Sequence, residues 1–139
     1  MPFKLVLAAA LAFAGCGPVN HTPAPAGGPL VGSLQVTPLE NRVDLTLLIT
    51  NVSEQPVELT FRSGQSFDFE VSRGGREVWR WSAERVFTQA IRQETVAAGE
   101  TLRYRASWRP PAGAAGEYRV TGRLSADYPL EQSSTFRLP

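Results

Sequence analysis

Apolar and polar side chains alternate with a period of two along most of the chain, which is the spacing of a β-strand with one buried face. In the clearest run, 43–50, Val, Leu or Ile occupies every odd position. The same alternation predicts further strands over 33–37, 57–61, 67–71, 77–81, 102–108, 118–124 and at 136–138. A turn over 51–56 separates the runs 43–50 and 57–61, so we expect two consecutive antiparallel strands there.

Turn signals connect these runs. A Gly-Gly pair at 74–75 lies between 67–71 and 77–81 and can adopt the positive φ angles of a tight hairpin turn. Segment 84–92 (ERVFTQAIR) follows no strand period, and we expect a loop that packs Phe87 inward. Seven or eight short strands without a long helical period predict an all-β fold, namely a two-sheet antiparallel β-sandwich.

The amino-terminal segment has the pattern of an export signal. Residues 1–15 combine a positive charge, an apolar run too short to span a bilayer, and small residues before Cys16. Cys16 is the only cysteine, so an internal disulfide cannot form. The sequence FAGC over 13–16 resembles a bacterial lipobox, which implies lipid on Cys16 and a firm membrane anchor. Ordinary signal cleavage beside a chance cysteine is the alternative.

Residues 16–32 are rich in Pro and Gly and predict a flexible tether, which leaves 33–139 as the folded domain. Removal of the leader also removes Lys4, the only lysine, so that thirteen Arg balance thirteen acidic side chains. The arginines are scattered, which argues against nucleic acid as a partner. Neutral charge and the lack of an evident apolar patch lead us to expect a monomer.

The residue types of the folded part argue against catalysis. The only histidine, His21, lies in the tether, so no Ser-His pair and no His-containing zinc site can form in the domain. The carboxylates of the strand-like runs fall on the polar side of the alternation, where we expect them in solvent; they are Asp44, Glu58, Asp68 and Glu70. Phosphate-loop and calcium-loop spacings are absent from the sequence. We therefore expect no enzyme activity, no metal and no cofactor.

Four motifs occur in an order that is typical of one family. They are SGQSFDFEV (63–71), GREVWRWS (75–82), AAGETLRY (97–104) and GEYRV (116–120). Over roughly 43–138 the chain resembles the BsuPI domain, the bacterial intracellular proteinase inhibitor family. The resemblance implies an immunoglobulin-like sandwich and a protein partner, with a protease as one candidate. The namesake of the family works in the cytoplasm, whereas this chain carries an export signal, so the namesake's target is not carried over.

The stretch 64–82 supports two interpretations. In the structural one, its Phe side chains face the core, and the neighbouring carboxylates meet Arg76 or Arg80 across the hairpin. In the functional one, Trp79, Arg80 and Trp81 form an exposed recognition patch, because Trp and Arg are frequent at binding hot spots.

Two long connections, 82–92 and 109–117, offer a way to contact a protease. Each carries an arginine, Arg85 or Arg109, that a trypsin-like pocket accepts, and an extended loop can pair with a cleft through its main chain. Both can equally be ordinary surface connections.

Three functions remain open, in decreasing order of support. The first is a lipid-anchored interaction module of the inhibitor family, exported to the bacterial cell envelope and acting on a protein such as a protease. The second is a non-inhibitory envelope accessory or glycan-binding sandwich. The third, an enzyme that uses carboxylates alone, would require two of them in one cleft, about 5 to 10 Å apart.

Overall fold

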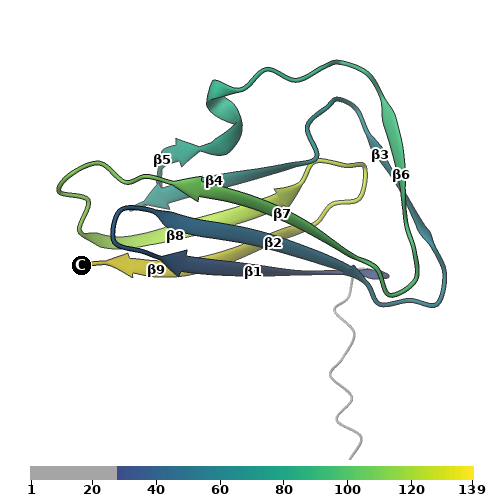
Figure 1. The fold of residues 1–139 in the computed structure, drawn as a ribbon, viewed down its shortest axis with the longest axis horizontal. Coiled ribbons are helices and arrows are strands. Elements are labelled where there is room, and N and C mark those ends of the chain that lie inside the picture. Colours follow the sequence, from purple (N-terminus) through teal and green to yellow (C-terminus); the bar gives the residue numbers. More distant parts are fainter. Residues whose placement is uncertain (1–27) are drawn as a thin grey trace, which may run out of the picture.

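The alternating runs form nine β-strands in the computed structural model of the chain, which describes residues 28–139 (Figure 1). The strands are β1 (Leu30–Pro38), β2 (Val43–Asn51), β3 (Val57–Phe61), β4 (Phe67–Arg73), β5 (Arg76–Arg80), β6 (Arg92–Val96), β7 (Thr101–Trp108), β8 (Gly116–Leu124) and β9 (Glu131–Leu138). A short 3-10 helix, η1 (Trp81–Glu84), follows β5. Cys16, the leader and most of the predicted tether lie outside the described residues. The domain itself begins earlier than the predicted residue 33, because β1 starts at Leu30.

Two antiparallel sheets make up the body of the molecule. The first has the strand order β1-β2-β7, and the second has the order β5-β4-β8-β9. Strands β3 and β6 pair with each other as a separate ribbon, which Figure 1 shows at the right-hand end. The expectation of an all-β antiparallel sandwich is confirmed, with more strands than the seven or eight predicted. Within 28–139, no helix has the length and apolar character needed to cross a membrane.

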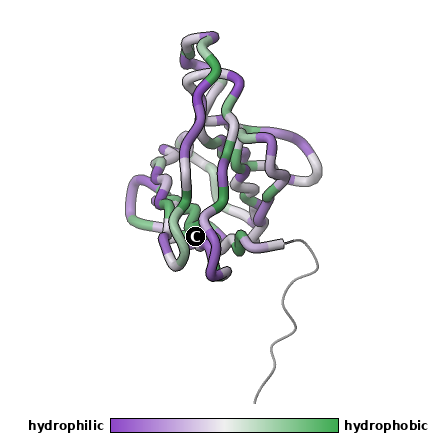
Figure 2. The backbone as a smooth tube through the Cα atoms, turned by 90° about the vertical axis from the view of Figure 1, so that its right-hand side faces the viewer, coloured by the Kyte–Doolittle hydropathy of each residue, from purple (hydrophilic) through white to green (hydrophobic). Residues whose placement is uncertain are grey.

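The core lies between the apolar faces of the two sheets. On β2 every odd residue from 43 to 51 is buried, and the facing sheet contributes Phe69, Val71 and Val120. Figure 2 shows the resulting alternation of hydrophobic and hydrophilic positions along the strands. Each large aliphatic or aromatic side chain that is fully buried contributes about 1.5–3 kcal/mol.

The two strands expected to be consecutive and antiparallel, β2 and β3, do not pair with each other, because the chain leaves the first sheet at Asn51. Its fully buried side chain donates from Nδ2 to the carbonyl oxygens of Gln55 (2.7 Å) and Val96 (3.0 Å). Its Oδ1 accepts from the backbone N–H of Ser53 (3.0 Å). These bonds turn the chain away from β2 and tie the turn to the end of β6, which becomes the partner of β3.

The hairpin predicted at Gly74 and Gly75 is confirmed. The two glycines have φ angles of 57° and 81°, and they connect β4 to β5. The predicted strand 77–81 ends early, however, because Trp81 begins η1. Trp79 and Trp81 therefore do not continue along one strand, and the chain turns between them toward the next loop.

Candidate functional site

A shallow pocket of about 390 Å³ lies between β5 and β7, which are edge strands of the two sheets. All five residues proposed from the sequence for interaction line it, together with three others. The lining consists of Trp79, Arg80, Trp81, Arg85 and Arg109, with Glu84, Ser107 and Trp108. The fold thus brings the WRW run, η1 and the starts of both candidate loops to one place.

Arg80 serves as a structural anchor in this pocket. Its guanidinium donates to Glu77 Oε1 (2.6 Å), to Glu70 Oε2 (3.0 Å) and to Asp68 Oδ2 (3.3 Å). Burial alone would lower the pKa of Arg80, but the hydrogen bonds to Glu77 and Asp68, together with the negative charges of Glu77 and Glu70, outweigh burial and raise it. Of Arg76 and Arg80, the two arginines expected to meet the β4 carboxylates, Arg80 therefore does so. All three of its side-chain nitrogens donate to carboxylates within the protein.

Asp68 holds the turn that follows β5, and the expectation that its side chain lies in solvent is wrong. Asp68 is only 8% exposed. The carboxylate accepts from the hydroxyl of Ser82 (2.6 Å) and from the backbone N–H groups of Ser82 (3.1 Å) and Phe69 (2.9 Å). These bonds fix η1 against β4 and so fix the direction in which the next loop begins.

The indole of Trp81 is covered by the protein. Phe67 stacks on it with 4.2 Å between the ring centroids, and the guanidinium carbon of Arg85 lies 4.3 Å from the indole centroid. Two groups this close to one ring fit only on opposite faces. Trp79 is half-buried and packs against Trp108, 6.5 Å away between centroids. The WRW run is therefore largely a support, as in the structural interpretation of the sequence.

The amino-terminal end of the 85–91 segment is tied to this support. Arg85 has extended backbone angles, its N–H donates to the carbonyl oxygen of Ser82 (3.1 Å), and its Nε donates to that of Trp81 (3.2 Å). Phe87 packs on Trp81 at 5.7 Å between centroids, so the prediction that it turns inward is confirmed.

The middle of the 85–91 segment is tied to a second support, the β3–β4 connection. The backbone N–H of Gly64 donates to the carbonyl oxygen of Thr88 (2.8 Å). Beyond the segment, Arg92 donates from Nε to the carbonyl oxygen of Ser63 (3.1 Å). The segment is therefore held on both sides, and Figure 1 shows it stretched along the top of the molecule between η1 and β6.

Between these ties the chain protrudes. The side chain of Val86 is 100% exposed and that of Ile91 is 70% exposed. Within residues 28–139, the backbone N–H and C=O groups of Val86 and Phe87 have no hydrogen-bond partner. An extended main chain with free donors and acceptors is the form in which a peptide adds to a cleft or sheet edge.

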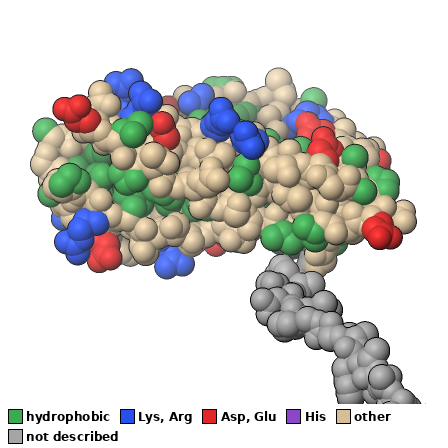
Figure 3. Space-filling view, turned by 60° about the horizontal axis from the view of Figure 1, so that its bottom comes forward, with side chains coloured by type: hydrophobic (Ala, Val, Ile, Leu, Met, Phe, Trp, Pro, Cys, Tyr) green, Lys and Arg blue, Asp and Glu red, His purple; other side chains and the backbone are tan. Residues whose placement is uncertain are grey.

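The second candidate loop, 109–117, is more closely packed. Tyr118 donates its hydroxyl proton to the carbonyl oxygen of Ala114 (2.6 Å), and Gly113 supplies a positive φ of 76°. The loop borders a pocket of about 410 Å³ with the β1–β2 turn and the carboxyl terminus. In Figure 3 the largest group of hydrophobic side chains lies at the left of the face shown, with charges of both signs around it, and smaller hydrophobic groups lie at the lower centre and right. Arg109 is exposed and also lines the pocket beside β5.

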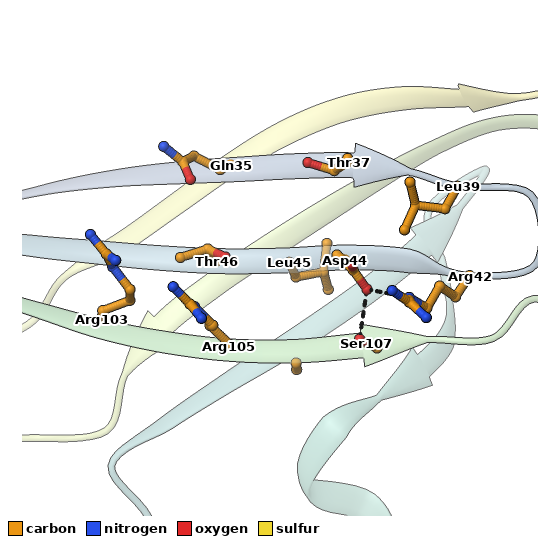
Figure 4. A pocket seen from close by; sticks show the side chains of 11 residues that line it. Gln35, Thr37, Leu39, Arg42, Asp44, Leu45, Thr46, Arg103, Arg105 and Ser107 are labelled. Atoms are coloured by element: carbon orange, nitrogen blue, oxygen red, sulfur yellow. Dashed lines mark hydrogen bonds and ion pairs between the residues drawn. The ribbon is translucent and has the colours of Figure 1, made fainter.

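A third hollow, about 640 Å³, lies on the outer face of the β1-β2-β7 sheet (Figure 4). Asp44 accepts there from the Ser107 hydroxyl (2.7 Å) and from Arg42 (2.9 Å), and these bonds lower its pKa. Arg103 and Arg105 extend alongside. The described part of the chain contains no cluster of three or more potential metal ligands. This open surface is an ordinary solvated sheet face.

The pocket residues can be predicted from the sequence, whereas the features that position the 85–91 segment cannot. Asp68, Gly64 and Arg92 act through contacts with distant parts of the chain, and the sequence carries no local signal for them. The full exposure of Val86 cannot be predicted either, because the segment has no period that assigns its side chains to faces.

Known sequences and structures were compared with the domain as a whole. No curated protein sequence matches the chain significantly. Among solved structures, β-glucosidase from Kluyveromyces marxianus in complex with glucose aligns with a TM-score of 0.46 and 13% identity, over 79% of this chain and 14% of that one. Spo0M, a sporulation control protein from Bacillus subtilis, aligns with a TM-score of 0.44 and 13% identity, over 80% of this chain and 49% of that one.

The family comparison covers most of the described residues. The BsuPI family model, described as an intracellular proteinase inhibitor, matches residues 30–128, which include β1 to β8 and the 85–91 segment. Its description is that of an inhibitor and not of a catalyst. The chain belongs to the BsuPI family of proteinase inhibitors.

Proposed function

We propose that this protein inhibits a protease of the bacterial cell envelope by presenting its 85–91 segment to the active-site cleft. The observation that carries the proposal is the state of that segment, which runs stretched between η1 and β6, is held by hydrogen bonds at Arg85 and Thr88, and is fully exposed at Val86 between them. Family membership supports an inhibitory role, and the segment offers a means of performing it.

The geometry suits the way a protease holds a peptide. A protease cleft pairs with an extended main chain and receives alternate side chains in pockets. The free backbone groups of Val86 and Phe87 are available for such pairing. Because Ser82 and Gly64 already restrain the segment, less conformational entropy is lost on binding than with a flexible loop, which favours affinity.

A lipid anchor places this activity at a membrane. The FAGC sequence over 13–16 supports attachment of lipid to Cys16, and the Pro- and Gly-rich residues that follow can hold the domain away from the bilayer. In cells of its own organism grown with a labelled fatty acid, the wild-type protein should carry the label and sediment with membranes. A Cys16→Ser variant should do neither. A soluble, unlabelled wild-type protein would contradict the anchor.

The glycan-binding alternative has less support from this surface. Sugar binding by aromatic side chains requires an open ring face, and both faces of Trp81 are covered, by Phe67 and by Arg85. The half-buried Trp79 packs on Trp108.

The proposal is tested by capture and inhibition. The full chain, purified in mild detergent and immobilised, is incubated with envelope extract from its own organism, and retained proteins are identified by mass spectrometry. We expect a protease whose hydrolysis of a peptide substrate stops when one equivalent of the full chain is added. Retention of non-proteolytic proteins alone, with envelope protease activity unchanged by excess inhibitor, would contradict the proposal.

A further inference from the structure

Arg85 has extended backbone angles, and in an extended chain neighbouring side chains point to opposite sides. Arg85 is drawn back onto Trp81, where its guanidinium lies over the indole and its Nε is hydrogen-bonded. Phe87 is also turned toward Trp81. Val86, between them, is the residue that faces away from the domain, with its side chain fully in solvent.

We propose that Val86 is the specificity residue of this inhibitor and enters the primary pocket of a protease that prefers small aliphatic side chains. This inference rests on the proposed inhibitory function and adds the class of target. It differs from the expectation from sequence, in which Arg85 would fill a trypsin-like pocket.

The contacts of Arg85 give the physical reason for this choice. To enter a protease pocket, Arg85 would have to leave the Trp81 ring and break the hydrogen bond from its Nε. A cation over an indole and a charge-assisted hydrogen bond both favour the retracted position. Val86 needs no such rearrangement, because its side chain makes no contact that has to be broken.

The properties of Val86 define the pocket that it fits. A branched, uncharged side chain of this size is complementary to the small apolar pocket of an elastase-like enzyme. A trypsin-like pocket carries a buried carboxylate, which valine would leave unpaired. The flanking residues contribute differently: Arg85 and Phe87 clamp the segment to Trp81 and hold Val86 outward.

The test uses the full chain with elastase and trypsin as probes, in parallel with the protease captured from the envelope. Val86→Asp places a charge in the apolar pocket and should weaken inhibition of elastase and of the captured enzyme by about 100-fold or more. Val52→Asp is the matched control, because Val52 is 61% exposed in the β2–β3 turn and should leave inhibition unchanged. Val86→Arg should transfer inhibition from elastase to trypsin. Arg85→Ala loosens the clamp on Trp81 and should weaken inhibition of elastase without abolishing it.

The outcomes separate this inference from the function on which it rests. Equal inhibition by the wild type and Val86→Asp, or inhibition of trypsin that disappears in Arg85→Ala, would overturn the role of Val86 while leaving the inhibitor function intact. Inhibition of the captured enzyme without any effect on elastase would overturn the aliphatic preference. Failure to inhibit every enzyme, the captured one included, would overturn the proposed function itself. Because Val86 lies in solvent, its variants should have the same denaturant midpoint of unfolding as the wild type.

Discussion

Replacing Asp68 with alanine removes the carboxylate that ties η1 to β4. Three of its hydrogen bonds join it to backbone or hydroxyl groups of Ser82 and Phe69, and a fourth comes from Arg80. A hydrogen bond to a charged group contributes about 1.5–3 kcal/mol, but water replaces part of this at a site that is not completely sealed. The bond from the partly exposed Arg80 is discounted further. We expect the free energy of unfolding to fall by about 2–4 kcal/mol.

The assay is equilibrium unfolding in urea, followed by tryptophan fluorescence, with the thermal midpoint as a second measure. A loss of this size should lower the thermal midpoint by roughly 10 °C in a domain of this length. Glu40→Ala is the control, because Glu40 is an exposed carboxylate in the β1–β2 turn and its loss should change little. Asp68→Asn should fall between the two. A change below about 0.5 kcal/mol for Asp68→Ala would refute the assigned role of these bonds.

Three further results are expected. Asn51→Ala leaves the buried carbonyl oxygen of Val96 without its donor, so the free energy of unfolding in urea should fall by about 3 kcal/mol. An unchanged urea midpoint would contradict this. Gly64→Ala should weaken protease inhibition with little loss of stability, because a Cβ there would lie 2.8 Å from Thr88 Oγ1 and displace the 85–91 segment. Unchanged inhibition would refute the role of the Gly64–Thr88 hydrogen bond. Burial raises the pKa of Tyr104 to about 12, so its contribution to stability is present below about pH 10 and is lost as pH rises toward about 12. Tyr104→Phe should therefore lose less stability than the wild type between about pH 10 and pH 12 in urea titrations, and identical losses would argue against the shift.

The sequence predicts the strands of this fold well where one face is buried. The run from Val43 to Ile49 and the hairpin at Gly74 and Gly75 follow from local pattern alone. Strand β6 is not found in this way, because its RQETV sequence buries only Val96 and therefore carries little alternation. The pairing of β3 with β6 depends on the buried side chain of Asn51, whose partners a period-two pattern does not reveal.

The candidate site is predicted in its composition but not in its arrangement. The Trp and Arg residues stand out in the sequence and do line one pocket. Asp68 looks like a solvated strand residue because its hydrogen-bond partner Ser82 is 14 residues away along the chain. The direction of Arg85 and Val86 is set by Trp81 and by Gly64, so it follows only from tertiary contacts.

The most direct measurement of the central claim is a competition for the active site. The protease captured by the full chain is treated with a covalent inhibitor that fills its catalytic cleft, and its binding to the immobilised chain is compared with that of the untreated enzyme. The account predicts that binding is lost, because the 85–91 segment needs the cleft to be open. Equal binding of the blocked and the free enzyme would show that this protein contacts its partner elsewhere, and would contradict the account.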